Sequence, residues 1–339
     1  MTVTSVLTVI AVILTLAYAV LNGFRDSSTA IAAAVRTRAL TPVVAVVVAA
    51  FFAFLGTLAT SGLSTALVDA LNFNVPDGTA GLKMVICGLI TAGAWGIYCW
   101  WRGMPMSSTH SLLSALVGAS GAAAFVGDES MAGAWQLLLG SVLLPLLVAP
   151  VVAYALSYLA VIPAMWLVRH NTSRTVNEVS RTGQAVTACA AALGLGLQDG
   201  QRTGALVALV LMNGHMMDPG PVTWVIQLAA AAALSFGVLL GGWRITHTLG
   251  RRLVNFDPLR GMIAQGVSAI MLFLGSLVFH LPLSTTQTVT SGIVGAGHNQ
   301  SFESVFWRNV AKVARIWVLT PVVCIFGGAV FTLAISPLF

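Results

Sequence analysis

Two polar motifs of one type stand in otherwise apolar stretches of this chain, and their side chains are suited to binding a small oxyanion. The first is MPMSSTHSLLSALVGA at Met104–Ala119, and the second is LPLSTTQTVTSGIVGA at Leu281–Ala296. In each motif a proline is followed, after one residue, by three successive hydroxyl side chains. Proline is tolerated in the first turn of a helix, so each motif can begin a short helix whose free N–H groups and positive end face an anion. The pair of motifs predicts two half-sites for one oxyanion.

An acidic residue precedes each motif within an apolar segment, in NGFRDSSTAIAAAV around Asp26 and in GLQDGQRTGALVAL around Asp199. A charge inside a membrane costs about 2.5 kcal/mol or more on insertion scales, so such a residue indicates function. Together with the side-chain amides of Asn22, Gln198 and Gln201, the two carboxylates offer hard oxygen ligands for a small cation or a proton. Anion and cation ligands in one chain indicate coupled symport.

A simpler interpretation of both segments stays open. Asp26 lies next to Arg25, and Asp199 lies about one helical turn before Arg202, so each carboxylate could form a structural ion pair. Serine and threonine hydroxyls in membrane helices also bond often to a carbonyl of their own helix without any functional role. The recurrence of the same residue types in both halves favours the functional interpretation, because a site built from two repeats requires both copies.

The composition places these motifs in a membrane protein. The 339 residues are 58% hydrophobic and 8% charged, with a mean hydropathy of +0.92, whereas soluble domains carry about 25% charged residues. Several apolar runs approach or exceed the roughly 20 residues that cross a bilayer. They are Val3–Phe24, Thr41–Leu63, Met84–Trp101, Trp135–Val168 and Val222–Trp243. The sequence thus predicts an all-α, multi-pass membrane protein with about 10–12 membrane segments, the first of which is retained as a helix.

The basic residues predict how the chain crosses the membrane and give no reason to expect nucleic-acid binding. Arg169–Arg181 and Arg244–Arg260 are rich in arginine and should be cytoplasmic, whereas Asn213–Pro221 between them lacks Lys and Arg and should be outside. In the first half the order is reversed, since basic residues follow the first crossing and acidic residues follow the second. Residues 1–168 and 169–339 are therefore expected to be two inverted transmembrane repeats with broken or re-entrant helices and a binding site near the midplane.

At these residues the chain resembles a known family. It has NGFxD near the N-terminus, a D-x-Q-K/R-T segment opening the second half and two P-x-S-S/T-T motifs, as in the inorganic phosphate transporter (PiT) family, and the resemblance covers nearly the whole chain. It implies an anion permease of the bacterial inner membrane. It further implies two inverted repeats that move phosphate, or in some relatives sulfate, with sodium ions or protons.

The resemblance also implies roles for individual residues. Cation ligands are expected at Asp26 and Asp199, supported by Asn22 and Gln201, with Na⁺ as the candidate metal ion. The implied anion ligands are Ser107, Ser108, Thr109, Ser284, Thr285 and Thr286.

The chain departs from the family pattern in ways that bear on the coupling ion. Arg25 stands where histidine is usual, Thr29 where asparagine is usual, and Gln198 where asparagine is usual. Fewer asparagine oxygens make a sodium site weaker. Arg25 could bind the anion through two hydrogen bonds, neutralise Asp26 in place of a cation, or extend to the membrane interface.

These patterns predict secondary active transport of inorganic phosphate, coupled to Na⁺ or H⁺, by alternating access. Sulfate or another oxyanion is the alternative substrate, and an anion channel or a sensor is the alternative class. An enzyme is not expected, because no pair of nucleophile and base can be identified. The expected partners are the anion, the co-transported cation and the lipid bilayer, with no further cofactor, and the sequence leaves open whether two copies form a homodimer.

Overall fold

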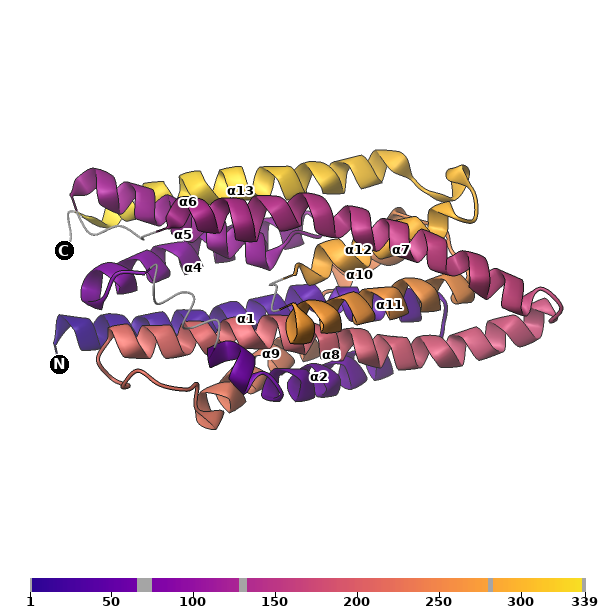
Figure 1. Ribbon diagram of the computed structural model, residues 1–339, viewed down its shortest axis with the longest axis horizontal. Helices are drawn as coiled ribbons and strands as arrows, with labels where there is room; N and C mark the ends of the chain where they lie inside the picture. Colours follow the sequence, from indigo (N-terminus) through magenta and orange to yellow (C-terminus); the bar gives the residue numbers. More distant parts are fainter. Residues whose placement is uncertain (1, 66–74, 128–132, 280–282, 337–339) are drawn as a thin grey trace.

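The computed structural model describes residues 2–65, 75–127, 133–279 and 283–336. These residues form helices that run mostly along the long axis of the molecule, and α1 begins at the same end at which α13 finishes (Figure 1). The protein is all-helical, as the sequence predicts. The helices are α1 (Val3–Arg36), α2 (Pro42–Leu58), α4 (Gly78–Trp101), α5 (Ser108–Val126), α6 (Ala134–Leu137), η1 (Leu138–Leu143), α7 (Leu144–Val168), α8 (Ser173–Asn213), α9 (Trp224–Leu240), α10 (Trp243–His247), η2 (Thr248–Arg252), α11 (Pro258–Phe273), η3 (Leu274–Val278), α12 (Thr285–His298), η4 (Phe302–Ser304) and α13 (Trp307–Ile335).

The helices have the length and the surface of membrane spans. Six helical segments of the described ranges are long and apolar enough to cross a bilayer, and there are seven if α9 is joined to α10 and η2. Large apolar side chains such as Val43, Leu167 and Phe326 are exposed on the outer surface, where they suit contact with lipid. The total of about 10–12 segments stays a prediction, because it depends on the shorter helices.

The arginine-rich segment Arg169–Arg181 is mostly helical. Residues 173–181 of the arginine-rich segment belong to α8, which is a single helix of 41 residues. Its first turns are polar and exposed, and Arg174 Nε lies 3.0 Å from Glu178 Oε1 one turn later. Ion pairs at this spacing stabilise a helix outside the bilayer, so the helix extends beyond the apolar segment.

A broken helix separates α9 from α10. The chain bends by 57° at this break, and Gly241 there has a φ of +66°, which glycine adopts readily and other residues rarely do. Gly242 packs directly on the backbone of α1, since a Cβ atom at this position would lie 2.5 Å from Phe24 O. Its N–H donates to Ser27 Oγ at 2.9 Å. The break therefore fixes the basic segment that follows it next to the centre of α1.

Two helix pairs carry the polar motifs into the interior. α4 and α5 approach the centre from the end where α1 begins, and α11 and α12 approach from the opposite end (Figure 1). Ser107 Oγ accepts the N–H of His110 at 3.2 Å, and Ser284 Oγ accepts the N–H of Gln287 at 3.3 Å. Each motif helix thus begins one residue after a capping serine and not at the proline, because the serine satisfies a free N–H group of the first turn. Pro282 of the second motif lies outside the described residues.

The two motif helices pack closely on outer helices of the opposite half. A Cβ atom on Gly118 of α5 would lie 1.9 Å from Ile325 O of α13, and one on Gly295 of α12 would lie 2.2 Å from Tyr154 O of α7. Only glycine permits these approaches, as small residues do between membrane helices. The halves of the chain are therefore interlocked around the motifs.

Candidate binding site at the centre of the protein

The carboxylate of Asp26 lies where the two polar motifs meet. Ser108 Oγ donates to Asp26 Oδ2 at 2.6 Å, and Thr286 Oγ1 donates to Asp26 Oδ1 at 3.0 Å. All three side chains are buried. One residue of α1 thus joins the first turns of α5 and α12, and the positive ends of both helices converge on it.

Arg25 is completely buried beside Asp26. Its Nη2 atom lies 3.6 Å from Asp26 Oδ1 and donates to Met106 O at 3.2 Å. Its Nε and Nη1 atoms have no hydrogen-bond partner among the described residues. Because no part of the side chain is exposed, Arg25 does not extend to the membrane interface, and the two remaining interpretations are anion binding and neutralisation of Asp26. Two unpartnered donors on one buried guanidinium are available to the oxygens of an anion.

Asp199 on α8 forms an ion pair with Arg202, one turn later on the same helix. Arg202 also donates to Thr109 Oγ1 of the first motif and, through Nε, to Gln198 O at 3.3 Å. The other carboxylate oxygen, Asp199 Oδ2, has no hydrogen-bond partner among the described residues. The structural ion pair that the sequence left open is therefore present, and one oxygen of Asp199 remains available to a cation or a proton.

Two consecutive residues of the first motif connect the groups around Asp26 with those around Asp199. Ser108 contacts Asp26, and the next residue, Thr109, contacts Arg202. Of the other predicted anion ligands, the two capping serines and Thr285 are buried in the first turns of the motif helices. Of the predicted cation ligands, Gln201 is buried and Gln198 Nε2 donates to Leu272 O at 3.4 Å.

Further buried polar atoms next to these residues lack a partner within the described chain. They are Asn22 Oδ1, both ring nitrogens of His110 and both side-chain polar atoms of Gln287. His110 and Gln287 occupy the same position of the two motifs. An unsatisfied buried donor or acceptor costs about 1–3 kcal/mol. The centre therefore holds hydrogen-bonding groups that a bound ligand would satisfy.

Comparison with known proteins identifies the family. Residues 22–328 match the phosphate transporter family. The chain belongs to this family. A probable low-affinity inorganic phosphate transporter of Bacillus subtilis (strain 168) is 29% identical over 338 residues, covering 98% of both chains. One from Rhizobium meliloti (strain 1021) is 34% identical over 305 residues, covering 88% of both chains.

A solved structure of a sodium-dependent phosphate transporter has the same fold. It matches 98% of this chain and 100% of its own with a TM-score of 0.85, at 19% sequence identity. Proteins of the phosphate transporter family are transporters and not enzymes, and the apolar helices and bacterial relatives make this member a multi-pass protein of the bacterial inner membrane.

Tyr18 is a residue of the site that the motifs of the sequence do not reveal. Its hydroxyl group donates to Ser108 O at 3.0 Å and lies 3.2 Å from Ser111 Oγ. Tyr18 precedes Asp26 by about two helical turns and therefore lies on the same face of α1. The sequence offered two signals for this residue. One is its spacing from Asp26, and the other is that a tyrosine within a membrane span needs a partner for its hydroxyl group.

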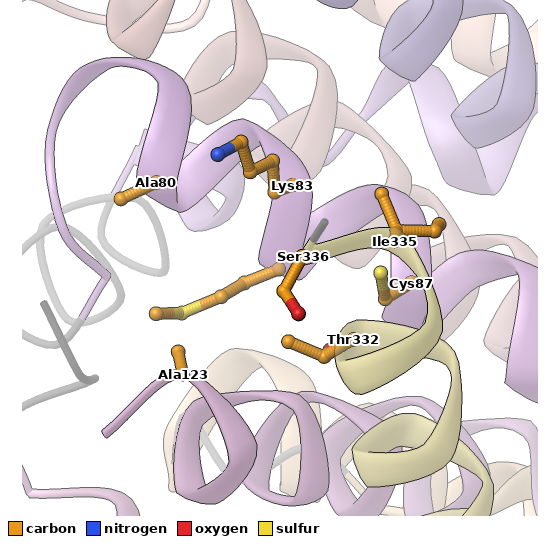
Figure 2. Close-up of a pocket in the computed structure, with 8 residues that line it drawn as sticks. Ala80, Lys83, Cys87, Ala123, Thr332, Ile335 and Ser336 are labelled. Carbon is orange, nitrogen blue, oxygen red and sulfur yellow. The ribbon is translucent and has the colours of Figure 1, made fainter. Parts of the chain in front are cut away.

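The described ranges offer no alternative site in the form of a metal-binding cluster. No group of three or more His, Cys, Asp or Glu residues that could hold a metal ion occurs there. Figure 2 shows a small pocket at the far end of α5, lined by residues such as Lys83, Cys87, Ala123 and Thr332. Its volume of about 20 Å³ holds roughly one water molecule, so it does not accommodate an oxyanion.

Proposed function

We propose that the chain carries inorganic phosphate across the inner membrane together with a sodium ion or a proton, by alternating access. The observation that carries this proposal is the contact of Asp26 with one hydroxyl group from each motif. The two motif helices belong to helix pairs that enter from opposite ends of the molecule (Figure 1). A phosphate ion bound between them would contact both helix pairs at once. Its binding would therefore affect the helices that enter from both ends of the molecule.

The balance of charges at the centre supports coupling to a cation. Arg25 and Arg202 pair with Asp26 and Asp199, so the two positive and two negative charges cancel. A phosphate ion adds negative charge in a buried region, where uncompensated charge is strongly unfavourable. Sodium ions or protons that bind with the phosphate restore the balance, one for dihydrogen phosphate and two for monohydrogen phosphate. Coupling then follows from the requirement of neutrality.

The unpartnered atoms suggest places for the two ions. Arg25 Nε and Nη1 are donors for the anion, whereas Asn22 Oδ1 and Asp199 Oδ2 are acceptors for a cation or a proton. The Ser108 and Thr286 hydroxyl groups can turn from Asp26 to a phosphate oxygen by rotation of their side chains. Asp26 would then be free to take up the proton or the sodium ion, which links binding of the anion to binding of the cation.

We expect residues 1–168 and 169–339 to be two inverted repeats, and rocking would move each motif helix together with the helix of the opposite half on which it packs. Ser107 and Ser284 have nearly the same backbone angles, with φ of −81° and −82° and ψ of 116° and 111°. Gly23 and Gly196, each three residues before an acidic residue of the site, both lie against the backbone of a neighbouring helix. These matched details support an organisation in two inverted repeats, as transporters of this kind use.

Phosphate is favoured over sulfate by the presence of Asp26 among the hydroxyl groups. Monohydrogen phosphate carries an O–H group that can donate to a carboxylate, whereas sulfate has only acceptors at neutral pH. The test is uptake of radiolabelled phosphate into proteoliposomes under an inward sodium or proton gradient, with excess unlabelled sulfate as competitor. Accumulation that sulfate leaves intact supports the proposal. Loss of uptake to sulfate would indicate another oxyanion permease, and current without accumulation would indicate a channel.

The double variant Ser108→Ala with Thr286→Ala is expected to raise the KM for phosphate by about tenfold to a hundredfold, because each lost hydrogen bond is worth about 1 kcal/mol. The measurement is initial uptake at varied external phosphate. Thr15→Ala is the matched control, since Thr15 Oγ1 donates to Ala11 O of its own helix at 2.7 Å. A KM for the double variant equal to that of the control would assign the hydroxyl groups to packing alone.

Gly96→Ala is expected to slow uptake by about tenfold through the position of Arg25. The added methyl group would lie 2.8 Å from Arg25 Nη1, so the guanidinium group must move away from its place beside Asp26. Gly93→Ala on the same helix is the control, because its Cβ meets no atom closer than 4.0 Å while the gain in helix propensity is the same. Equal uptake by the two variants would remove Arg25 from the proposed anion site.

A further inference from the structure

A second polar cavity lies outside the central site, where α4 ends and α10 begins. It has a volume of about 490 Å³ and is open to solvent. Its lining contains three arginines, one histidine and two tryptophans, namely Arg102, Arg244, Arg252, His247, Trp101 and Trp243. The arginine-rich ends of the helices mark this side as cytoplasmic. We refer to this cavity as the basic vestibule.

The vestibule is strongly electropositive. No Asp or Glu belongs to its described lining, and neither Arg102 nor Arg252 forms an ion pair within the described residues. Arg244 is held in place, since its Nη1 donates to Trp101 O at 2.9 Å and its guanidinium group lies 5.2 Å from the ring centre of Trp100. Several guanidinium groups around one cavity without a carboxylate form an anion site, and their planar donors match the geometry of a phosphate group.

Both walls of the vestibule are connected to the central site. Thr248 of η2 donates to Gly103 O at 2.7 Å, and Gly103 begins the short segment in which Met106 O accepts from Arg25. On the opposite wall, Gly242 donates to Ser27, next to Asp26 on α1. An anion in the vestibule would therefore contact both segments that hold the central charges.

We propose that the basic vestibule binds a phosphate group at the cytoplasmic mouth of the protein, separately from the central site. Arg102, Arg244 and Arg252 supply the charged donors, and the two tryptophans form the rim. The phosphate group belongs either to free inorganic phosphate or to the headgroup of an anionic lipid, since both present the same oxygens to the arginines. Binding at this site stabilises the position of the segment around Gly103 relative to the start of α10.

The test compares the full-length protein with the double variant Arg102→Gln with Arg252→Gln in nanodiscs. Calorimetric titration with inorganic phosphate in phosphatidylcholine discs counts the sites, and native mass spectrometry in phosphatidylglycerol discs counts retained anionic lipids. Arg308→Gln with Arg315→Gln on α13 is the matched control, because it removes the same charge from exposed positions outside the vestibule. The wild type and the control are expected to bind one more phosphate group than the vestibule variant, whose second site should weaken by at least about tenfold.

The result separates the two sources of the phosphate group. A phosphate site lost from the vestibule variant in phosphatidylcholine identifies free phosphate, and a retained phosphatidylglycerol lost from that variant identifies a lipid headgroup. Equal counts for all three proteins in both arms would overturn the proposal, as would equal losses in the vestibule variant and the control. If the central site does not take phosphate, every count falls by one while the difference between the proteins remains.

Discussion

Asp26→Asn is expected to abolish the accumulation of phosphate and to lower gradient-driven uptake by about 100-fold, which corresponds to about 2.7 kcal/mol. The asparagine side chain can still accept a hydrogen bond from Ser108 or Thr286, but it has no charge with which to bind a sodium ion or a proton. Arg25 would then lose its partner, and the centre would carry an uncompensated positive charge. Phosphate could still bind, but it would no longer carry a cation with it.

Two assays on the same proteoliposomes distinguish lost coupling from lost folding. Exchange of internal for external phosphate without a gradient should persist in Asp26→Asn, because exchange requires binding and rocking but no net movement of a cation. Asp77→Asn is the control, since Asp77 is exposed and its side chain makes no capping hydrogen bond at the start of α4. Accumulation by Asp26→Asn at the level of this control would refute the coupling role of the carboxylate.

Arg202→Gln is expected to lower the free energy of unfolding by about 3–5 kcal/mol, because it leaves Asp199 as a buried charge without a partner. The measurement is thermal unfolding of the purified protein in detergent, followed by tryptophan fluorescence. Arg174→Gln is the matched control, since Arg174 and Glu178 form an ion pair on the same helix with side chains that are 88% and 63% exposed. Exposed pairs contribute about 0–1 kcal/mol, so the control should unfold close to the wild type.

A second substitution tests whether Asp199 only pairs with Arg202 or also binds the coupling ion. Adding Asp199→Asn to Arg202→Gln removes the unpaired charge and should recover much of the lost stability. If Asp199 also serves the cation, the restored protein should remain defective in gradient-driven uptake. Recovery of stability and uptake together would make the pair purely structural, and no recovery of stability would show that Arg202 acts through Thr109 instead.

The residues of the candidate site were predictable because they are encoded in residue types at local spacing. Hydroxyl groups after a proline, and lone carboxylates in apolar segments, identify Ser108, Thr286 and Asp26 from the amino-acid sequence alone. Their convergence confirms that the motifs belong together in space. The helical membrane architecture also followed from the composition, since a chain with 8% charged residues cannot cover a soluble fold.

Contacts between distant helices were not predictable from one sequence. The reach of Arg202 to Thr109 joins α8 to α5, and the full burial of Arg25 depends on the approach of α4. Neither of these contacts can be inferred from the spacing of residues along the chain. The break at Gly241 likewise depends on tertiary packing, because the close contact of Gly242 with α1 forms only in the folded chain.

Because Ser108 and Thr286 already donate to Asp26, a substrate at the proposed site would meet an internal competitor. An oxyanion at the proposed site would have to displace a carboxylate from the same two donors, so part of what the anion gains would be offset. The free energy of anion binding would thus be the difference between the hydrogen bonds to the anion and those to the Asp26 carboxylate. The same competition would accelerate release, since the hydroxyl groups would return to Asp26 when the anion leaves. A carrier of the proposed design would bind its substrate less tightly and release it faster.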